Sequence, residues 1–309
     1  MTTEDPPRLH SNSQTLSLSF TSSLIQSSMR LAAPDELVLD YTRAMMGFLL
    51  AQPAPRSLLM IGLGGGSMLK YLHRHLPDTV FTVVEISQAV IDLRNDFLIP
   101  PDSERLRTVC DDGARFVREL ARKLVDADRP AEAHFDVILV DGFDGTGLPP
   151  ALSSRRFYED CRRVLADDGV LVANVQADTA RSREIRQRLS RAFDGALISV
   201  ESDEGGNEVM LASSLAQWQA TLAGFESRLP ADQPNSAYSD CMSAGDRSHS
   251  VLVRAIARGI ADGSIDRDAG DPLLIGFTLW GLMHGIIQLT MVKRGELQRR
   301  GIATETLIE

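Results

Sequence analysis

Short apolar runs alternate with amphipathic segments through the middle of the chain. The apolar runs are rich in β-branched residues and are bounded by Gly, Asp or Pro, which is typical of buried strands. The predicted strands are residues 57–62, 79–84, 106–110, 136–140 and 169–174, and the predicted helices between them are residues 67–75, 87–97, 114–125 and 153–165. Strands that alternate with helices are joined by right-handed crossovers. The pattern therefore predicts an α/β fold with a doubly wound, mostly parallel sheet.

The pattern continues beyond the fifth strand. A further helix is predicted at residues 179–193, followed by strands at residues 196–200 and 208–213. The turn between these two strands contains Gly205-Gly206, which favours an antiparallel hairpin at the edge of the sheet. We expect this α/β domain to occupy residues 51–228.

The N-terminal region carries a weaker pattern. Residues 15–20 alternate Leu and Ser as a strand does, and Pro34-Asp35 predicts the start of a helix that runs to Leu50. The first residues are polar and include Glu4, without the basic and then apolar run of a signal peptide. We therefore expect an N-terminal tail and lid over residues 1–50, and a cytoplasmic protein.

The C-terminal region changes character after a polar, proline-containing linker. Residues 248–261 have helical spacing, and residues 273–292 contain no formally charged side chain. The second segment is long enough to cross a bilayer. A helix that is apolar all round can also lie in a protein core or a dimer interface. We favour the second interpretation and expect residues 236–309 to form a C-terminal α-helical extension of a homodimer that does not enter the membrane.

Charge and cysteine content narrow the possible partners. The net formal charge is −10 and the isoelectric point is near 5.1, which argues against nucleic acid as a partner because nucleic-acid-binding proteins concentrate Lys and Arg. The three cysteines, Cys110, Cys161 and Cys241, are widely spaced and form no C-x-x-C motif. Neither a disulfide framework nor a metal site is expected.

The first predicted strand ends in the glycine loop Gly62-Leu63-Gly64-Gly65-Gly66, and a predicted helix begins at Ser67. Such a loop offers backbone amides to a ligand that approaches the main chain closely. The nicotinamide fingerprint requires a glycine where this chain has Ser67, whereas the G-x-G-x-G spacing of S-adenosylmethionine enzymes is complete. We expect Gly62, Gly64 and Gly66 to contact an adenosyl group.

Acidic residues follow the next three strands. Glu85 is placed to accept the ribose hydroxyl groups, and Asp112, followed by Gly113, is placed to accept the adenine amino group. The fourth strand is followed by Asp141 and Asp144. Two carboxylates at this spacing can share a cationic amine, since one holds the ammonium group while the other accepts a proton.

These motifs resemble those of the spermidine synthase family of polyamine aminopropyltransferases over about residues 26–215. The resemblance is carried by Gln26, Tyr41 with Met45, the glycine loop, Val84-Glu85-Ile86, Asp112-Gly113, the segment from Asp136 to Asp144, and Phe157-Tyr158 with Cys161, Leu165 and Gly169. It implies transfer of an aminopropyl group from decarboxylated S-adenosylmethionine to a small amine, with no tightly bound cofactor.

The resemblance also implies a role for each matching residue. Gln26, Gly62, Gly64, Gly66, Glu85, Asp112 and Gly113 would bind the adenosyl co-substrate. Asp141 would be the catalytic base, and Asp144 and Tyr41 would bind the amine. The co-substrate would be decarboxylated S-adenosylmethionine or S-adenosylmethionine itself.

Four features depart from the family pattern. The family's glycine loop reads GGGDGG, with an aspartate for the donor's amine, whereas this chain has Gly65, Gly66 and Ser67. The family's Asp-Pro after the second carboxylate is Asp144-Gly145, a histidine near Tyr41 is missing, and the N-terminal β-domain is reduced to about thirty residues. A methyltransferase on the same fold, or a nucleoside-binding sensor without catalysis, therefore remains an alternative.

The C-terminal region has a resemblance of its own. Arg247-Ser248-His249, the segment 255–263 and the segment 279–285 are similar to the ligand-binding, dimerising helices of TetR-type regulators. No DNA-reading helix-turn-helix precedes them, so DNA binding is not implied. The resemblance supports a helical, dimerising domain over residues 236–309.

Overall fold

The computed structural model describes residues 6–20, 25–126, 134–143, 147–202 and 206–228, together with Arg258 and Ala261. The chain divides into two units, Met1–Phe225 and Glu226–Glu309. The predicted apolar helix at residues 273–292 and nearly all of the TetR-like region lie outside the described residues. The predicted domain bounds, the homodimer and the cytoplasmic location stay predictions. Among the helices that the structure describes, none is both long and apolar enough to cross a membrane.

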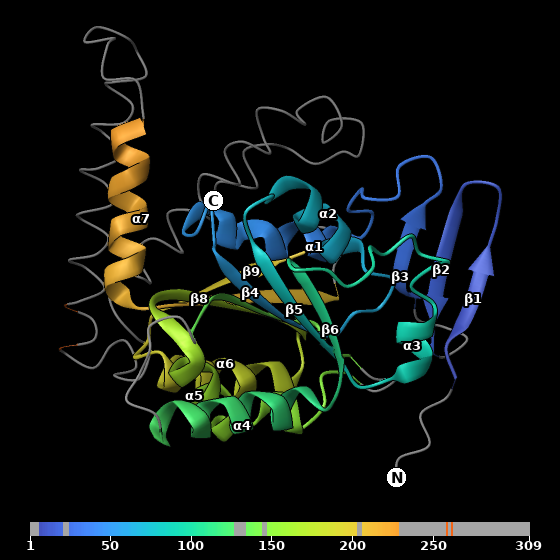
Figure 1. The fold of residues 1–309 in the computed structure, drawn as a ribbon. Coiled ribbons are helices and arrows are strands. Elements are labelled where there is room, and N and C mark those ends of the chain that lie inside the picture. The colour runs from blue at the N-terminus through green and yellow to red at the C-terminus, as the bar shows by residue number, and fades with distance from the viewer. Residues whose placement is uncertain are drawn as a thin grey trace, which may run out of the picture. The chain divides into compact units, whose positions relative to one another are not determined.

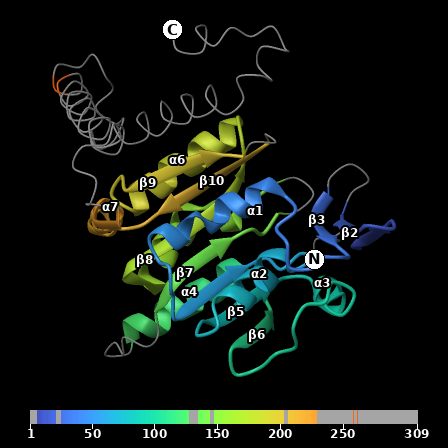
Figure 2. The ribbon, with the colours of Figure 1, turned by 90° about the horizontal axis from the view of Figure 1, so that it is seen from above.

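A seven-stranded sheet forms the centre of the first unit (Figures 1 and 2). Its strands are β4 (Ser57–Ile61), β5 (Val80–Glu85), β6 (Leu106–Cys110), β7 (Phe135–Val140), β8 (Leu165–Gln176), β9 (Leu197–Glu201) and β10 (Asn207–Ala212). Their order across the sheet is β6-β5-β4-β7-β8-β10-β9. Strands β4 to β8 are parallel, whereas β10 is antiparallel to both of its neighbours. The predicted doubly wound, mostly parallel sheet is confirmed.

Helices cover both faces of the sheet, which is why the central strands read as continuous apolar runs. One face carries α4 (Gly113–Asp126), α5 (Arg155–Val164) and α6 (Ala180–Ala192), and the other carries α1 (Asp40–Met45), η1 (Met46–Leu50) and α2 (Ser67–His75) (Figure 1). Val137, Ile138, Leu139 and Val140 of β7 are completely buried between these layers. The remaining helices are α3 (Gln88–Asp92), η3 (Ala151–Ser153) and α7 (Leu215–Arg228).

The chain reverses direction across the sheet between β4 and β7. It runs outward from β4 through β5 to β6, then crosses back to add β7 on the other side of β4. Ligands of open α/β sheets bind at the carboxyl ends of the strands at such a reversal. The topology therefore places the ends of β4, β5, β6 and β7 around one position.

The C-terminal hairpin is antiparallel as predicted, but its second strand occupies the inner position. Strand β10 pairs with β8, and β9 pairs only with β10, at the edge. Five of the six residues of β10 are buried, whereas β9 is half-buried or exposed along its length. The more apolar strand takes the inner position because it buries both of its faces there.

The N-terminal residues form a separate three-stranded antiparallel sheet of β1 (Arg8–Ser11), β2 (Thr15–Ser19) and β3 (Ile25–Arg30). The sequence predicted only β2. Strand β1 is exposed along its whole length, and β3 contains two adjacent serines, so neither strand shows the apolar alternation of a half-buried strand.

Two predicted helices are shorter than expected. The helix predicted from Pro34 begins at Asp40, because Leu39 is extended and Arg43 donates a side-chain hydrogen bond to the carbonyl oxygen of Leu37. The helix predicted at residues 87–97 ends at Asp92, and turns follow it up to Leu98, whose φ is +55°. This second departure brings Phe97 to the glycine loop.

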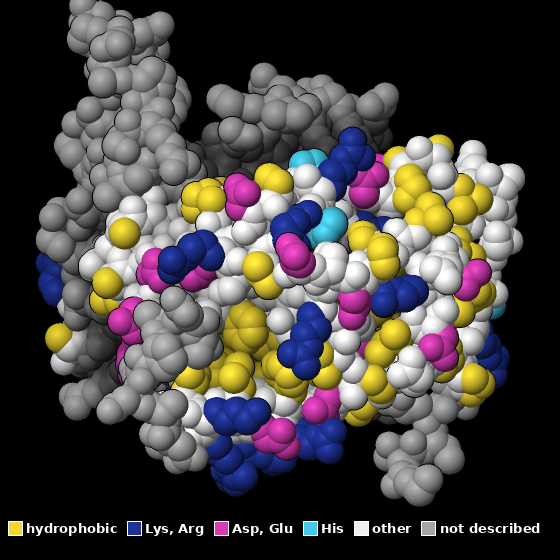
Figure 3. All heavy atoms as spheres, viewed as in Figure 1, with side chains coloured by type: hydrophobic (Ala, Val, Ile, Leu, Met, Phe, Trp, Pro, Cys, Tyr) yellow, Lys and Arg dark blue, Asp and Glu magenta, His cyan; other side chains and the backbone are white. Residues whose placement is uncertain are grey.

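On the face shown in Figure 3, the basic and acidic side chains of the described residues are interspersed. This part of the surface carries no continuous basic stripe that would follow a nucleic-acid backbone.

Candidate active site

The glycine loop joins the end of β4 to the start of α2. Gly62, Gly64 and Gly66 have φ values of +94°, +51° and +64°, which glycine adopts without the steric cost of a side chain. A Cβ atom on Gly62 would lie 2.3 Å from the carbonyl oxygen of Asp141. Gly62 is therefore required for the ends of β4 and β7 to approach each other.

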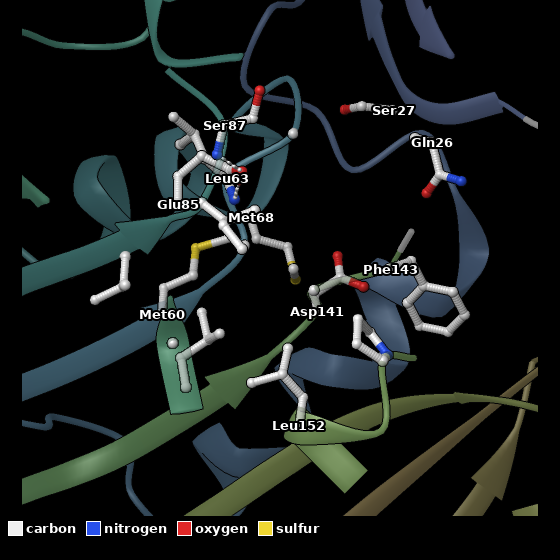
Figure 4. A pocket seen from close by; sticks show the side chains of 18 of the residues that line it. Gln26, Ser27, Met60, Leu63, Met68, Glu85, Ser87, Asp141, Phe143 and Leu152 are labelled. Atoms are coloured by element: carbon white, nitrogen blue, oxygen red, sulfur yellow. Dashed lines mark hydrogen bonds between the residues drawn. The ribbon is translucent and has the colours of Figure 1, made fainter. Parts of the chain in front are cut away.

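A cavity of about 530 Å³ opens beside this loop at the carboxyl ends of the strands. Eight of the residues predicted for the site line it: Gln26, Tyr41, Gly62, Gly64, Glu85, Asp112, Gly113 and Asp141. Figure 4 shows Glu85 and Asp141 on opposite sides of the cavity. Gly66 precedes α2 and does not line the cavity, and Asp144 lies outside the described residues. The fold thus collects nearly the whole predicted set around one space.

Glu85 is held rigidly at the end of β5. Its Oε2 atom accepts a hydrogen bond from the backbone amide of Leu63 at 2.8 Å, and its Oε1 atom accepts one from the amide of Ser87 at 2.9 Å (Figure 4). The side chain is 7% exposed. Because a carboxylate has about four acceptor positions, both oxygens can also accept hydroxyl groups of a ligand.

Asp112 has a structural role besides its place in the cavity wall. Its Oδ1 atom accepts the backbone amide of Arg115 at 2.8 Å, as an N-cap side chain does at the start of a helix. This bond fixes the carboxylate at the start of α4. Asp112 therefore reaches the cavity with a defined orientation.

Both oxygens of Asp141 accept hydrogen bonds from side chains distant in the sequence. The hydroxyl group of Tyr41, on α1, donates to Oδ2 at 3.2 Å, and the amide group of Asn174, on β8, donates to Oδ1 at 2.8 Å. Asn207, at the start of β10, donates to the Oδ1 atom of Asn174 at 2.9 Å. Four polar side chains, from α1, the residue after β7, β8 and β10, thus form one chain of hydrogen bonds.

Burial sets the acid–base properties of this group. It raises the pKa of Asp141 above the ordinary range of an aspartate, the hydrogen bonds from Asn174 and Tyr41 lower it, and the charge of Glu85 raises it further. The pKa of Tyr41 is also raised, first by burial and then by the charge of Asp141. Asp141 is therefore a stronger base than a solvated aspartate, and Tyr41 stays protonated as a donor.

The other end of the glycine loop is closed by an aromatic ring and a hydroxyl group. A Cβ atom on Gly65 would lie 2.7 Å from Cδ1 of Phe97 and 2.7 Å from Oγ of Ser27. The hydroxyl groups of Ser27 and Ser67 lie 3.4 Å apart, and both residues line the cavity. The chain thus places hydroxyl groups and an apolar ring beside Gly65, where the family resemblance leads one to expect a carboxylate.

A buried lysine supports this arrangement from behind the loop. Lys70 of α2 is 5% exposed, and its Nζ atom donates to the carbonyl oxygen of Phe97 at 2.7 Å and to the sulfur of Met29 at 2.9 Å. Burial lowers the pKa of Lys70 to about 8, against a smaller opposing effect of Asp35. The lysine therefore fixes the backbone that carries Phe97.

The charge of the cavity wall is one-sided. Glu85, Asp112 and Asp141 contribute carboxylates, and none of the described residues that line the cavity is Lys, Arg or His. Three aromatic side chains, Phe20, Tyr41 and Phe143, also line it. A cavity with these properties favours a ligand that carries positive charge.

Sequence reasoning missed Ser27, Phe97, Asn174 and Asn207. The sequence does contain a signal for Asn174, because it is the single amide in an otherwise apolar run of a strand predicted to be buried. A buried amide requires hydrogen-bonding partners. Ser27 lies in β3, which the sequence did not predict, Phe97 lies in a turn and Asn207 begins β10, so the neighbours of all three depend on the fold.

Comparison with known proteins agrees with this site. The sequence model of the Spermine/spermidine synthase domain family matches residues 38–200. A polyamine aminopropyltransferase of Chromobacterium violaceum is 40% identical over 209 residues, which is 66% of this chain and 76% of that protein. A polyamine aminopropyltransferase of Neisseria meningitidis serogroup B is 36% identical over 224 residues, or 72% of this chain and 80% of that protein.

Solved structures share the fold. A probable spermidine synthase from Corynebacterium glutamicum is 22% identical, with a TM-score of 0.54, over 70% of this chain and 81% of that one. The human Methyltransferase-like protein 13, solved in complex with SAH, is 23% identical, with a TM-score of 0.52, over 66% of this chain and 99% of that one. The fold is therefore shared by aminopropyl- and methyltransferases.

Proposed function

The chain belongs to the spermine/spermidine synthase family and is a transferase of the polyamine aminopropyltransferase type; from this premise we propose that it uses decarboxylated S-adenosylmethionine as donor and a small amine as acceptor. The observation that carries the proposal is the charge of the cavity. Its described wall has three carboxylates and no cationic side chain.

The donor's nucleoside fits the half of the cavity formed by the glycine loop and the ends of β5 and β6. We assign the ribose hydroxyls to Glu85, whose oxygens already face two backbone amides. We assign the adenine amino group to Asp112, and the close approach of the main chain to the glycines Gly62 and Gly64. The support for these roles is the position of all four residues in one cavity wall.

The donor's tail distinguishes the two possible co-substrates. S-adenosylmethionine carries an α-carboxylate, and burying a carboxylate without a hydrogen-bonding or cationic partner is costly. The described cavity wall offers three carboxylates that would repel it. The decarboxylated donor carries only positive charge beside its nucleoside, so this cavity favours it.

The acceptor fits the opposite half, between Asp141 and the aromatic residues Tyr41 and Phe143. An ammonium group is attracted both by a carboxylate and by the face of an aromatic ring. Amine binding by Asp144 stays a prediction, because that residue lies outside the described ones.

The reaction is a displacement at the carbon beside the sulfonium. A neutral amine nitrogen forms a bond to this carbon, the carbon–sulfur bond breaks, and its electron pair leaves on sulfur as the neutral thioether methylthioadenosine. Asp141 takes the proton that the amine must lose to expose its lone pair. Because the leaving group needs no protonation, positioning of the amine and its deprotonation supply most of the catalysis.

One observation favours a second candidate function. The described residues beside Gly65 include no carboxylate to hold the donor's aminopropyl amine; Ser27 and Phe97 lie there instead. A methyltransferase that uses S-adenosylmethionine needs no such group. Methyl transfer to a small amine is therefore the second candidate.

Titration calorimetry and a turnover assay separate the two candidates. The protein is titrated with decarboxylated S-adenosylmethionine, with S-adenosylmethionine and with methylthioadenosine, and is then assayed with putrescine and other small amines. We expect the decarboxylated donor to bind at least about tenfold more tightly than S-adenosylmethionine, which corresponds to one absent unfavourable charge contact. We also expect it to yield methylthioadenosine. Tighter binding of S-adenosylmethionine together with methylated product would overturn the proposal in favour of the second candidate.

A further inference from the structure

The side chain of Asn174 is an amide inside an apolar strand. The four residues before it, Val170 to Ala173, are completely buried, and Asn174 itself is 2% exposed. Burying an amide is unfavourable unless its hydrogen bonds are made. From its position on β8, the Asn174 amide reaches the carboxylate of Asp141, the residue that follows the neighbouring strand β7.

The hydrogen bonds of Asn174 allow only one orientation of its amide group. Its Nδ2 atom donates to Asp141 at 2.8 Å, and its Oδ1 atom accepts from Asn207 at 2.9 Å. Rotating the amide by half a turn would set its oxygen against the Asp141 carboxylate and its NH2 group against the NH2 group of Asn207. Because an ionised carboxylate only accepts hydrogen bonds, Asp141 fixes which end of Asn174 faces it, and Asn207 satisfies the other end.

We propose that Asn174 is a positioning residue for Asp141, and that Asn207, through Asn174, ties the carboxylate to the β9–β10 hairpin. The effect of this positioning on amine transfer rests on the proposed function, whereas the hydrogen bonds among Asp141, Asn174 and Asn207 are independent of it. Asn174 does not line the cavity, so it acts through Asp141 and not on the substrate.

The groups that face Asp141 determine how removal of the Asn174 amide changes the proton affinity of the carboxylate. Tyr41 from α1 and Asn174 from β8 stabilise the ionised carboxylate by hydrogen bonds, whereas burial and Glu85 from β5 destabilise it. A hydrogen bond to a charged group contributes about twice as much as one between neutral groups. Without Asn174, Asp141 binds a proton more tightly, so less of it is ready to accept the proton of an amine at a given pH.

The test measures the titration of Asp141 itself. Protein labelled with 13C at the aspartate carboxyl carbons is titrated by NMR, and the Asp141 signal is identified by its loss in Asp141→Asn. In Asn174→Ala we expect the proton affinity of Asp141 to rise about tenfold. In Asn207→Ala we expect a smaller change in the same direction. Gln217→Ala is the matched control, because it removes an amide that donates to the carbonyl oxygen of Ala51 outside the cavity.

The second measurement is the pH dependence of kcat/KM. The acid limb should move to higher pH in Asn174→Ala by the amount seen in the NMR titration, with activity recovering as the pH rises. Affinity for methylthioadenosine should not change. A purely structural role would instead reduce activity equally at every pH.

An Asp141 titration that is unmoved in Asn174→Ala overturns the inference. If Asn174→Ala does not fold, the decision passes to Asn207→Ala, and an unmoved titration there has the same meaning. Wild-type protein that transfers no aminopropyl group to any amine would refute the proposed function, while the carboxyl titration would still decide the link between Asn174 and Asp141.

Discussion

The ring of Phe97 packs against Gly65, so that a Cβ atom on the glycine would lie 2.7 Å from Cδ1 of the ring. Phe97 is completely buried, and Lys70 holds its carbonyl oxygen. Gly65 has no positive φ, so the glycine is required by the space and not by the backbone conformation. The family's usual aspartate does not fit at this position unless the ring moves.

Substitution at Gly65 tests this packing. Gly65→Ala should lower the free energy of unfolding by about 1–3 kcal/mol, as overpacking does. The matched control is Gly47→Ala, because Gly47 also lacks a positive φ and its Cβ would meet only a Leu211 side-chain atom at 3.3 Å. The control should change stability by about 0.5 kcal/mol or less. Equal losses in both variants, measured by urea unfolding, would contradict the packing argument.

Glu85 should govern nucleoside binding. In Glu85→Gln, the amide NH2 group must face either the Leu63 or the Ser87 backbone amide, so the loop loses a hydrogen bond and the ligand loses a charged acceptor. We expect the Kd for methylthioadenosine, measured by calorimetry, to rise about 10- to 100-fold. Glu159→Gln is the control, since that side chain pairs with Arg155 outside the cavity. An unchanged Kd in Glu85→Gln would exclude the assigned role.

The pH dependence of turnover should report the buried state of Asp141. Because burial raises its pKa, the carboxylate becomes protonated, and loses its ability to act as a base, at a higher pH than a solvated aspartate does. The acid limb of kcat/KM should therefore lie above the ordinary aspartate range. In Asp141→Asn, turnover should be lost while methylthioadenosine still binds. Turnover at the wild-type rate in that variant would remove Asp141 from the mechanism.

Lys70 should make stability depend on pH in the alkaline range. Its folded-state pKa of about 8 lies below the ordinary value of 10.5, so the folded protein binds fewer protons than the unfolded chain between these values. The cost of burying the charge is fully present below pH 8 and is relieved as the pH rises. Relative to Lys70→Met, the wild type should gain about 1–3 kcal/mol of unfolding free energy from pH 7.5 to 10.

The comparison with Lys70→Met removes the effects of the other alkaline groups, which both proteins share. The measurement is urea unfolding at a series of pH values. A stability difference that does not vary with pH would mean that Lys70 keeps an ordinary pKa in the folded protein.

The sequence was sufficient to predict the central sheet and the nucleoside half of the site. Continuous apolar runs, bounded by turn residues, located β4, β5, β7 and β8 because these strands are largely buried between the two helical layers, whereas the edge strand β6 is only partly buried. The glycine loop, Glu85, Asp112 and Asp141 follow the ends of those strands directly. Once the strands are placed, topology alone brings these residues together.

The remaining parts depend on tertiary contacts. The late start of α1 at Asp40 accompanies an extended Leu39 and a side-chain hydrogen bond from Arg43 to the carbonyl oxygen of Leu37, which helix propensity does not predict. The place of β10 inside β9 is decided by burial, and Phe97 reaches Gly65 only because the chain turns at Leu98. The local sequence pattern does not predict which elements pack against each other when their residues are far apart in the sequence.

The order of the strands along the chain also sets the order in which the residues of the site are synthesised. The glycine loop, Glu85, Asp112 and Asp141 leave the ribosome well before Asn207, which begins the last strand of the sheet. A nascent chain therefore carries all the residues of its nucleoside half before β10 exists to insert beside β8. Tyr41 and Asn174, the two direct partners of the proton-accepting carboxylate, are also made before Asn207, so the last residue of the hydrogen-bonded chain to be synthesised is the one most distant from the cavity.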